Sequence, residues 1–135
     1  MKITRFEHIE AWQEARKLVK MVYDAIKKNP QFRKDFRLVG QVQDAAVSSM
    51  SNIVEGFARR GILFVSKSSV AEVQSQFYVA SDQGYVAKDE FGMIYDQAEI
   101  VSKLDSGFIK YLNSTFEGRS KPRQLNKLKQ PNQPR

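Results

Sequence analysis

Apolar residues recur every three or four positions along four long stretches of the chain, a spacing that places them on one face of a helix. The apolar stripe predicted for the first stretch consists of Trp12, Ala15, Val19, Val22 and Ile26. Asn29-Pro30 then interrupts the pattern, because proline cannot continue a helix. No stretch alternates apolar and polar residues over the length of a strand, so we expect no β-sheet.

The same spacing predicts three further helices. They extend over residues 36–59, over residues 62–81, and from Asp89 to at least Leu112. Residues 31–35 form a connection, and Gly84 supplies a C-cap after the third helix. Helices of this length joined by short loops predict an all-α protein, an antiparallel up-down-up-down four-helix bundle.

The last nineteen residues have a different composition. From Glu117 onward the chain is rich in Gly, Ser, Pro, Gln, Asn and basic residues, and Pro122, Pro131 and Pro134 oppose a long helix. We therefore predict a four-helix bundle domain over residues 1–116 and a disordered basic tail over residues 117–135.

Composition narrows the class of protein. A chain of 135 residues with 41% hydrophobic and 27% charged residues is typical of one globular domain. No run approaches the roughly 18 apolar residues of a membrane span, and residues 1–7 lack the apolar core of a signal peptide, so we expect a cytoplasmic location. The absence of cysteine excludes disulfides and thiolate metal sites.

Positive charge is concentrated at the two ends of the chain. Residues 1–37 carry ten Lys and Arg against five Asp and Glu, and residues 117–135 carry six against one. This asymmetry favours contact with the phosphates of RNA or DNA, although a solvated basic face on a protein-interaction module would look the same. The candidate nucleic-acid-binding residues are Arg16, Lys20, Lys27, Lys28, Arg33, Lys34 and Arg37.

Aromatic residues fall mostly on the predicted core stripes. We therefore expect few exposed rings on which bases could stack, and binding without base specificity.

The first predicted helix has a surplus of apolar residues. Ala11, Leu18, Met21 and Ala25 lie to one side of its stripe, so its apolar arc is wider than the roughly 100° that a helix needs to pack on a core. Two interpretations remain open. Leu18 and Met21 either broaden the contact with neighbouring helices or form an oligomer interface.

Several segments carry a resemblance to a known family. The motifs are Ala45-Ala46-Val47-Ser48, Ser51-Asn52-Ile53, Glu55-Gly56-Phe57 and Arg59-Arg60, together with residues 6–15, residues 72–76 and Gly84-Tyr85. In order and spacing they resemble the small bacterial four-helix-bundle proteins of 23S rRNA intervening sequences, fold relatives of the accessory variability determinants of diversity-generating retroelements.

The resemblance implies a ring-shaped homopentamer and, by analogy with the retroelement proteins, work with a reverse transcriptase and RNA. The chain departs from the family pattern at two places. Ser49-Met50 replaces an Ile-Pro, which removes a proline kink from the second helix. Gln43-Asp44 replaces a basic pair, which weakens the case for phosphate contacts on that face.

Residues for catalysis are missing from the pattern. The single histidine, His8, precedes the first helix, and neither a Glu-x-x-His pair nor a Gly-rich phosphate loop occurs. Asn52 and Glu55 lie beside Gly56, and we interpret them as structural polar residues that hydrogen-bond across helices, with a catalytic Glu55 as the alternative. We thus expect a protein that is not an enzyme and has no catalytic residue, metal site or cofactor.

Overall fold

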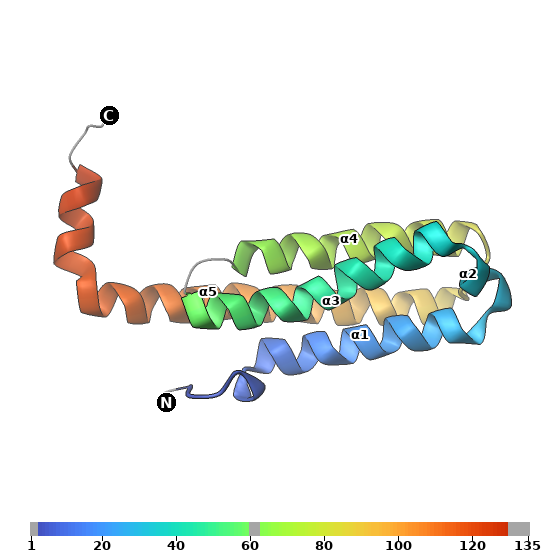
Figure 1. Cartoon of the computed structure of the whole chain (residues 1–135), viewed down its shortest axis with the longest axis horizontal. Helices are drawn as coiled ribbons and strands as arrows, with labels where there is room; N and C mark the ends of the chain where they lie inside the picture. The colour runs from blue at the N-terminus through green and yellow to red at the C-terminus, as the bar shows by residue number, and fades with distance from the viewer. Residues whose placement is uncertain (1–2, 60–62, 130–135) are drawn as a thin grey trace.

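The computed structural model describes residues 3–59 and 63–129, with side chains placed at residues 3–58 and 67–114. The described residues form helices without any strand (Figure 1). The elements are the short 3-10 helix η1 (Phe6–His8) and the α-helices α1 (Glu10–Lys28), α2 (Pro30–Lys34), α3 (Phe36–Arg59), α4 (Leu63–Asp82) and α5 (Lys88–Lys129).

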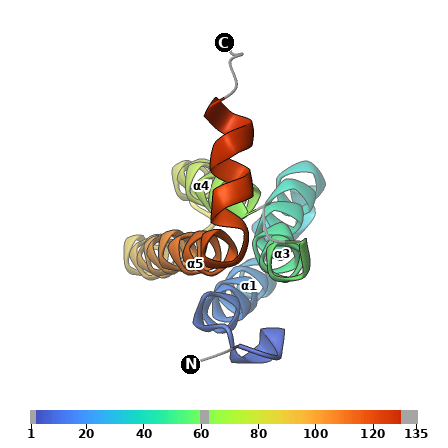
Figure 2. The same cartoon turned by 90° about the vertical axis from the view of Figure 1, so that its left-hand side faces the viewer.

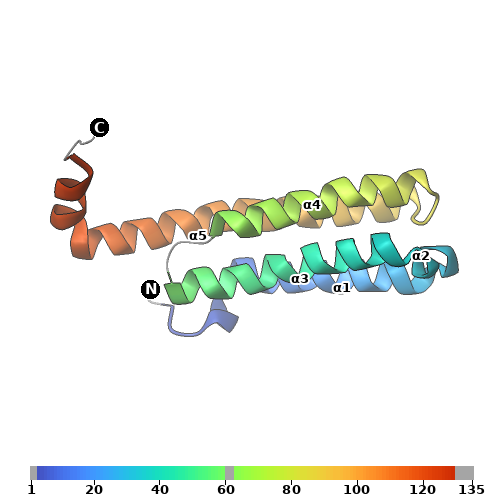
Figure 3. The same ribbon diagram turned by 45° about the horizontal axis from the view of Figure 1, so that its top comes forward.

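Four long helices pack around a common axis (Figure 2). The helix α1 contacts α3 and α5, and α4 contacts the same two helices, so α1 and α4 lie diagonally opposite each other. Successive long helices run in opposite directions (Figure 3). The predicted all-α antiparallel bundle is confirmed, and α3 has the predicted bounds.

The core stripe of α1 is rotated from its predicted position. The buried residues of this helix are Ala11, Ala15, Leu18, Val22, Ala25 and Ile26, whereas Trp12 and Val19 are only partly buried. At 100° per residue the true stripe lies about 50° from the predicted one. The rotation occurs because α1 packs between α3 and α5 and turns its smaller and aliphatic residues toward both helices.

This rotation decides the position of Leu18. Its side chain has no exposed surface in the single chain, so it belongs to the core and cannot contact a second copy while the bundle keeps this packing. The first of the two interpretations, contact with neighbouring helices, therefore fits Leu18.

The segment predicted as a plain connection is a short capped helix. The Asn29 side-chain oxygen accepts hydrogen bonds from the backbone N–H groups of Gln31 and Phe32, at 2.8 and 3.2 Å. Pro30 occupies the first turn, where its missing N–H costs nothing. The prediction of an irregular connection failed because it treated Asn29-Pro30 only as a stop signal, whereas the pair also starts a helix.

An aromatic cluster covers the core at the end of the bundle where α2 joins α1 to α3. Phe32 is fully buried, stacks on Tyr85 at 5.0 Å between ring centroids and meets Phe77 edge-on at 6.0 Å. The Tyr85 hydroxyl donates to Asp35 at 2.9 Å, and this bond raises the pKa of Tyr85, as does its partial burial. The helix α4, which precedes Tyr85, ends at the predicted glycine C-cap. Gly84 has φ 76°, and the Tyr85 N–H donates to the Ala80 carbonyl.

The helix α5 continues beyond the predicted boundary at residue 116. Leu112 is the last buried residue among those whose side chains are described, and the helix extends to Lys129. Figure 1 shows that its final part, in red, turns away from the bundle. The division at residue 116 and the disorder of residues 117–135 stay predictions. Within the described residues, no helix combines the length and apolar character of a membrane span.

Candidate nucleic-acid interface

Three of the predicted basic residues form a row along α1. Arg16, Lys20 and Lys27 occupy positions i, i+4 and i+11 and therefore share one helix face. That face is turned away from the buried stripe, and all three side chains are exposed. The row extends over about 17 Å at 1.5 Å per residue. We refer to these three residues as the basic row.

The other four predicted residues have different surroundings. Arg33 donates to the Lys27 carbonyl at the end of α1, so it both extends the basic row and satisfies that helix terminus. Lys28 lies on the other side of α1 and pairs with Glu90 of α5 at 3.4 Å. Lys34 and Arg37 are exposed on α2 and at the start of α3. The structure thus gathers Arg16, Lys20, Lys27 and Arg33, and it separates Lys28 from them.

Nearby carboxylates offset only part of this charge. Lys20 pairs with Asp24 at 3.2 Å, and the two side chains are 77% and 49% exposed, so water and salt screen the pair strongly. Among the described residues no carboxylate lies within 4 Å of the Arg16 guanidinium. The basic row therefore keeps a positive potential.

Glu14 balances a lysine next to the basic row. A hydrogen bond from Gln97 of α5 lowers the pKa of Glu14 against the opposing effect of its burial, and Lys17 at 3.2 Å lowers it further. Glu14 is consequently ionised at neutral pH and offsets the charge of Lys17, which leaves the positive potential concentrated at Arg16, Lys20 and Lys27.

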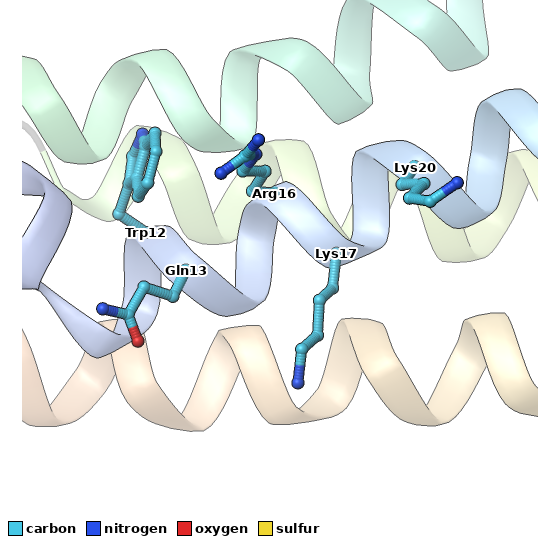
Figure 4. Close-up of a pocket in the computed structure, with 5 residues that line it drawn as sticks. All are labelled: Trp12, Gln13, Arg16, Lys17 and Lys20. Atoms are coloured by element: carbon cyan, nitrogen blue, oxygen red, sulfur yellow. The ribbon is translucent and has the colours of Figure 1, made fainter.

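A surface groove opens beside the basic row. It has a volume of about 310 Å³ and is lined by Trp12, Gln13, Arg16, Lys17 and Lys20. Figure 4 shows the Trp12 ring and the Arg16 guanidinium side by side, whereas Gln13 and Lys17 project the other way. The Arg16 Cζ atom lies 5.9 Å from the centroid of the Trp12 ring.

Sequence reasoning missed Trp12 as a surface residue. It assigned the indole to the core stripe, but the rotation of α1 brings part of the ring to the groove. The i, i+4 spacing of Trp12 and Arg16, which allows a cation–π contact on a helix surface, was the available signal.

Acidic side chains outnumber basic ones among the exposed residues of α4 and α5 that the structure describes. The exposed acidic residues of α4 and α5 include Glu72, Asp82, Asp89, Asp96 and Glu99. Glu72 and Asp82 belong to α4, which is diagonally opposite α1 in the bundle (Figure 2), whereas Asp89 of α5 lines a groove together with Lys28 of α1. A polyanion would be attracted to the α1 side.

The remaining predicted residues are only partly where the sequence placed them. Asn52 is partly buried and Gly56 is buried, in line with a close helix contact. Glu55 is exposed, and its hydrogen bond across helices stays a prediction. Met21 is partly buried and lies near Met93 of α5. In the described part of the chain, no three His, Cys, Asp or Glu side chains are grouped as a metal site would require.

Comparison with known proteins identifies one family. Residues 7–107, about three quarters of the chain, match the 23S rRNA-intervening sequence proteins. No curated protein matches the chain.

Proposed function

We propose that this chain, which belongs to the family of 23S rRNA-intervening sequence proteins, is a non-enzymatic accessory subunit that binds the backbone of RNA or DNA. The observation that carries the proposal is the basic row of α1, which is exposed and only partly offset by carboxylates. Lys and Arg at such a surface displace counterions from phosphates, and this release drives binding that does not depend on sequence.

The charge distribution also supports an orientation. The acidic residues Glu72 and Asp82 of α4, diagonally opposite α1, would repel a phosphate backbone, so the bundle would approach the nucleic acid with α1 first. Arg33 and Lys34 extend the positive surface beyond the end of α1. A phosphate backbone could thus follow α1 toward α2.

A salt series tests this proposal. We expect weak binding to structured RNA and to duplex DNA that loosens steeply with salt, with a slope of log affinity against log salt of about −0.7 to −0.9 for each phosphate neutralised. Fluorescence anisotropy of labelled RNA and DNA between low and moderate salt measures both quantities. If no binding occurs at low salt, the nucleic-acid proposal fails and the protein-interaction alternative takes its place.

Deletion of residues 118–135 separates the tail from the bundle. The deletion removes six of the twenty-two basic residues. We expect the deletion to lower the affinity and the salt slope together, because the phosphate contacts of the tail are lost. The basic row should retain the remaining affinity and salt slope. Complete loss of binding in the deletion variant would place the site in the tail rather than on α1.

The alternative function is a protein-interaction or scaffold module without nucleic-acid binding. The exposed apolar side chains favour it, because Tyr78, Met93 and Ile100 are 54%, 62% and 43% exposed.

A reverse transcriptase is a further candidate partner, suggested by the resemblance to retroelement accessory proteins. A reverse transcriptase gene beside a variable repeat at the same locus would support this partner.

We further propose a homo-oligomer, with a pentamer as the arrangement that the resemblance implies. Met93 is 62% exposed and lines a groove of about 250 Å³ together with Met21, Lys28 and Glu90, so these two methionines, rather than Leu18, offer apolar surface to a second copy.

Light scattering tests this assembly. The expected mass is five times 15.5 kDa, or about 78 kDa. Met21→Glu combined with Met93→Glu should dissociate the oligomer, because charge would enter an apolar interface, while circular dichroism stays helical. A monomeric parent at micromolar concentration would contradict the assembly, and an unchanged mass in the double variant would place the interface elsewhere.

A further inference from the structure

The Trp12 ring beside Arg16 is a feature that backbone binding does not use. The indole is the only tryptophan of the chain and lies partly exposed in a groove whose other side chains are polar or basic. A large ring at a surface usually has a reason, since burying it would stabilise the fold.

The ring is held firmly on its inner side. Phe6 meets Trp12 edge-on with 5.2 Å between centroids, and the Gln13 side chain donates to the Glu7 carbonyl at 2.9 Å. Both contacts tie η1 against the start of α1. The indole therefore has a fixed orientation before any ligand arrives, which lowers the entropy cost of binding.

The Arg16 guanidinium stands over the ring without tight stacking. The Arg16 Cζ atom lies 5.9 Å from the ring centroid, at the outer limit of about 6 Å for a cation–π contact. The guanidinium has no carboxylate partner among the described residues, so its N–H groups and its planar face are available to a ligand. Indole and guanidinium are the two kinds of side chain on which bases stack.

We propose that this groove takes one unpaired nucleobase of a single-stranded nucleic acid, with the base stacked against Trp12 and Arg16 and a flanking phosphate on Lys20. The inference rests on the proposed backbone binding and adds a preference for single strands. It follows because bases in a duplex are stacked on each other and cannot reach a side-chain ring, whereas unpaired bases can.

Charge and size favour this occupant over others. Arg16 and Lys20 line this groove together with Trp12, so an anionic ligand with a flat apolar part fits it, and a nucleotide has both. A volume of about 310 Å³ accommodates one base and its phosphate rather than a folded element. An acidic peptide would satisfy the charges but would leave the ring without a stacking partner.

Tryptophan fluorescence tests the inference on the full chain. Because Trp12 is the only tryptophan, its emission reports this groove alone. We expect a single-stranded oligouridylate of about 12 nucleotides to quench the emission and a duplex of equal length to leave it unchanged. Single-stranded DNA of the same length should act like the RNA, since the stacking surface belongs to the base.

Three substitutions separate stacking from charge. Trp12→Leu keeps an apolar side chain and the net charge, and it should weaken single-strand binding about tenfold with an unchanged salt slope, as measured by anisotropy of labelled oligonucleotide. Arg16 is exposed, so Arg16→Gln should leave the fold intact and remains informative if Trp12→Leu unfolds the protein. Lys20→Gln is its matched control, because it removes the same charge from the same groove without a ring contact.

The outcomes distinguish the two proposals. Arg16→Gln and Lys20→Gln should lower the salt slope equally, but only Arg16→Gln should reduce the preference for single strands. Equal binding of single strands and duplex with unchanged Trp12 emission would overturn the base site and leave backbone binding in place. Quenching by polyglutamate as strong as that by RNA would also overturn it. Absence of binding by any nucleic acid would overturn both.

Discussion

Replacement of Phe32 by Ala should lower the free energy of unfolding by about 3–5 kcal/mol, the largest single-residue effect that we expect in this chain. Phe32 has no exposed surface and fills the space between Phe77 and Tyr85. Its removal would leave a cavity at the end of the bundle where α2 joins α1 to α3. Urea unfolding followed by circular dichroism measures the change.

Phe36 provides a control of the same residue type four positions further on. It is 80% exposed at the start of α3, so Phe36→Ala should change the free energy of unfolding by less than about 0.5 kcal/mol. Similar changes in the free energy of unfolding for the two substitutions would contradict the role of Phe32 as a side chain that covers the core.

Reversal of the basic row should have the largest effect on binding. In the triple variant Arg16→Glu, Lys20→Glu and Lys27→Glu, three phosphate contacts are lost and three repulsive charges appear. We expect the salt slope to fall by about 2–3 and the affinity at low salt to fall about 100-fold or more. All three residues are exposed, so the fold should tolerate the change.

The matched control is a triple reversal on another helix. Lys88, Lys103 and Lys110 are exposed along one face of α5, and changing them to Glu alters the net charge by the same amount. Salt-dependent anisotropy of both variants with the same RNA compares the two faces. Equal losses of affinity would mean that net charge governs binding, and the assignment to α1 would be wrong.

The fold followed from the sequence because helix spacing and caps act locally. The bounds of α3 and the turn at Gly84 depend on residues within a few positions, and both predictions are confirmed. The rotation of α1 depends on which helices lie on either side of it, and a stripe of 3-4 spacing cannot encode that. An error of about 50° was enough to exchange the roles of Leu18 and Trp12.

The candidate site was predicted only in part for the same reason. Net charge identified the basic row, since long charged side chains at i and i+4 are exposed on any amphipathic helix. The groove beside it requires the orientation of Trp12, and the pairing of Lys28 with Glu90 requires the neighbour α5. Both are properties of tertiary packing, which no local pattern contains.

The position of α5 beside α1 has a consequence for synthesis on the ribosome. Gln97 donates to Glu14 across a separation of 83 residues, so α1 meets its second neighbour only after a further 83 residues have been synthesised. At about 5–20 residues per second, α1 waits roughly 4–17 s with one side of its core stripe exposed. During that interval α1 can pack on α3 alone, and the nascent chain offers apolar surface to chaperones until α5 closes the bundle.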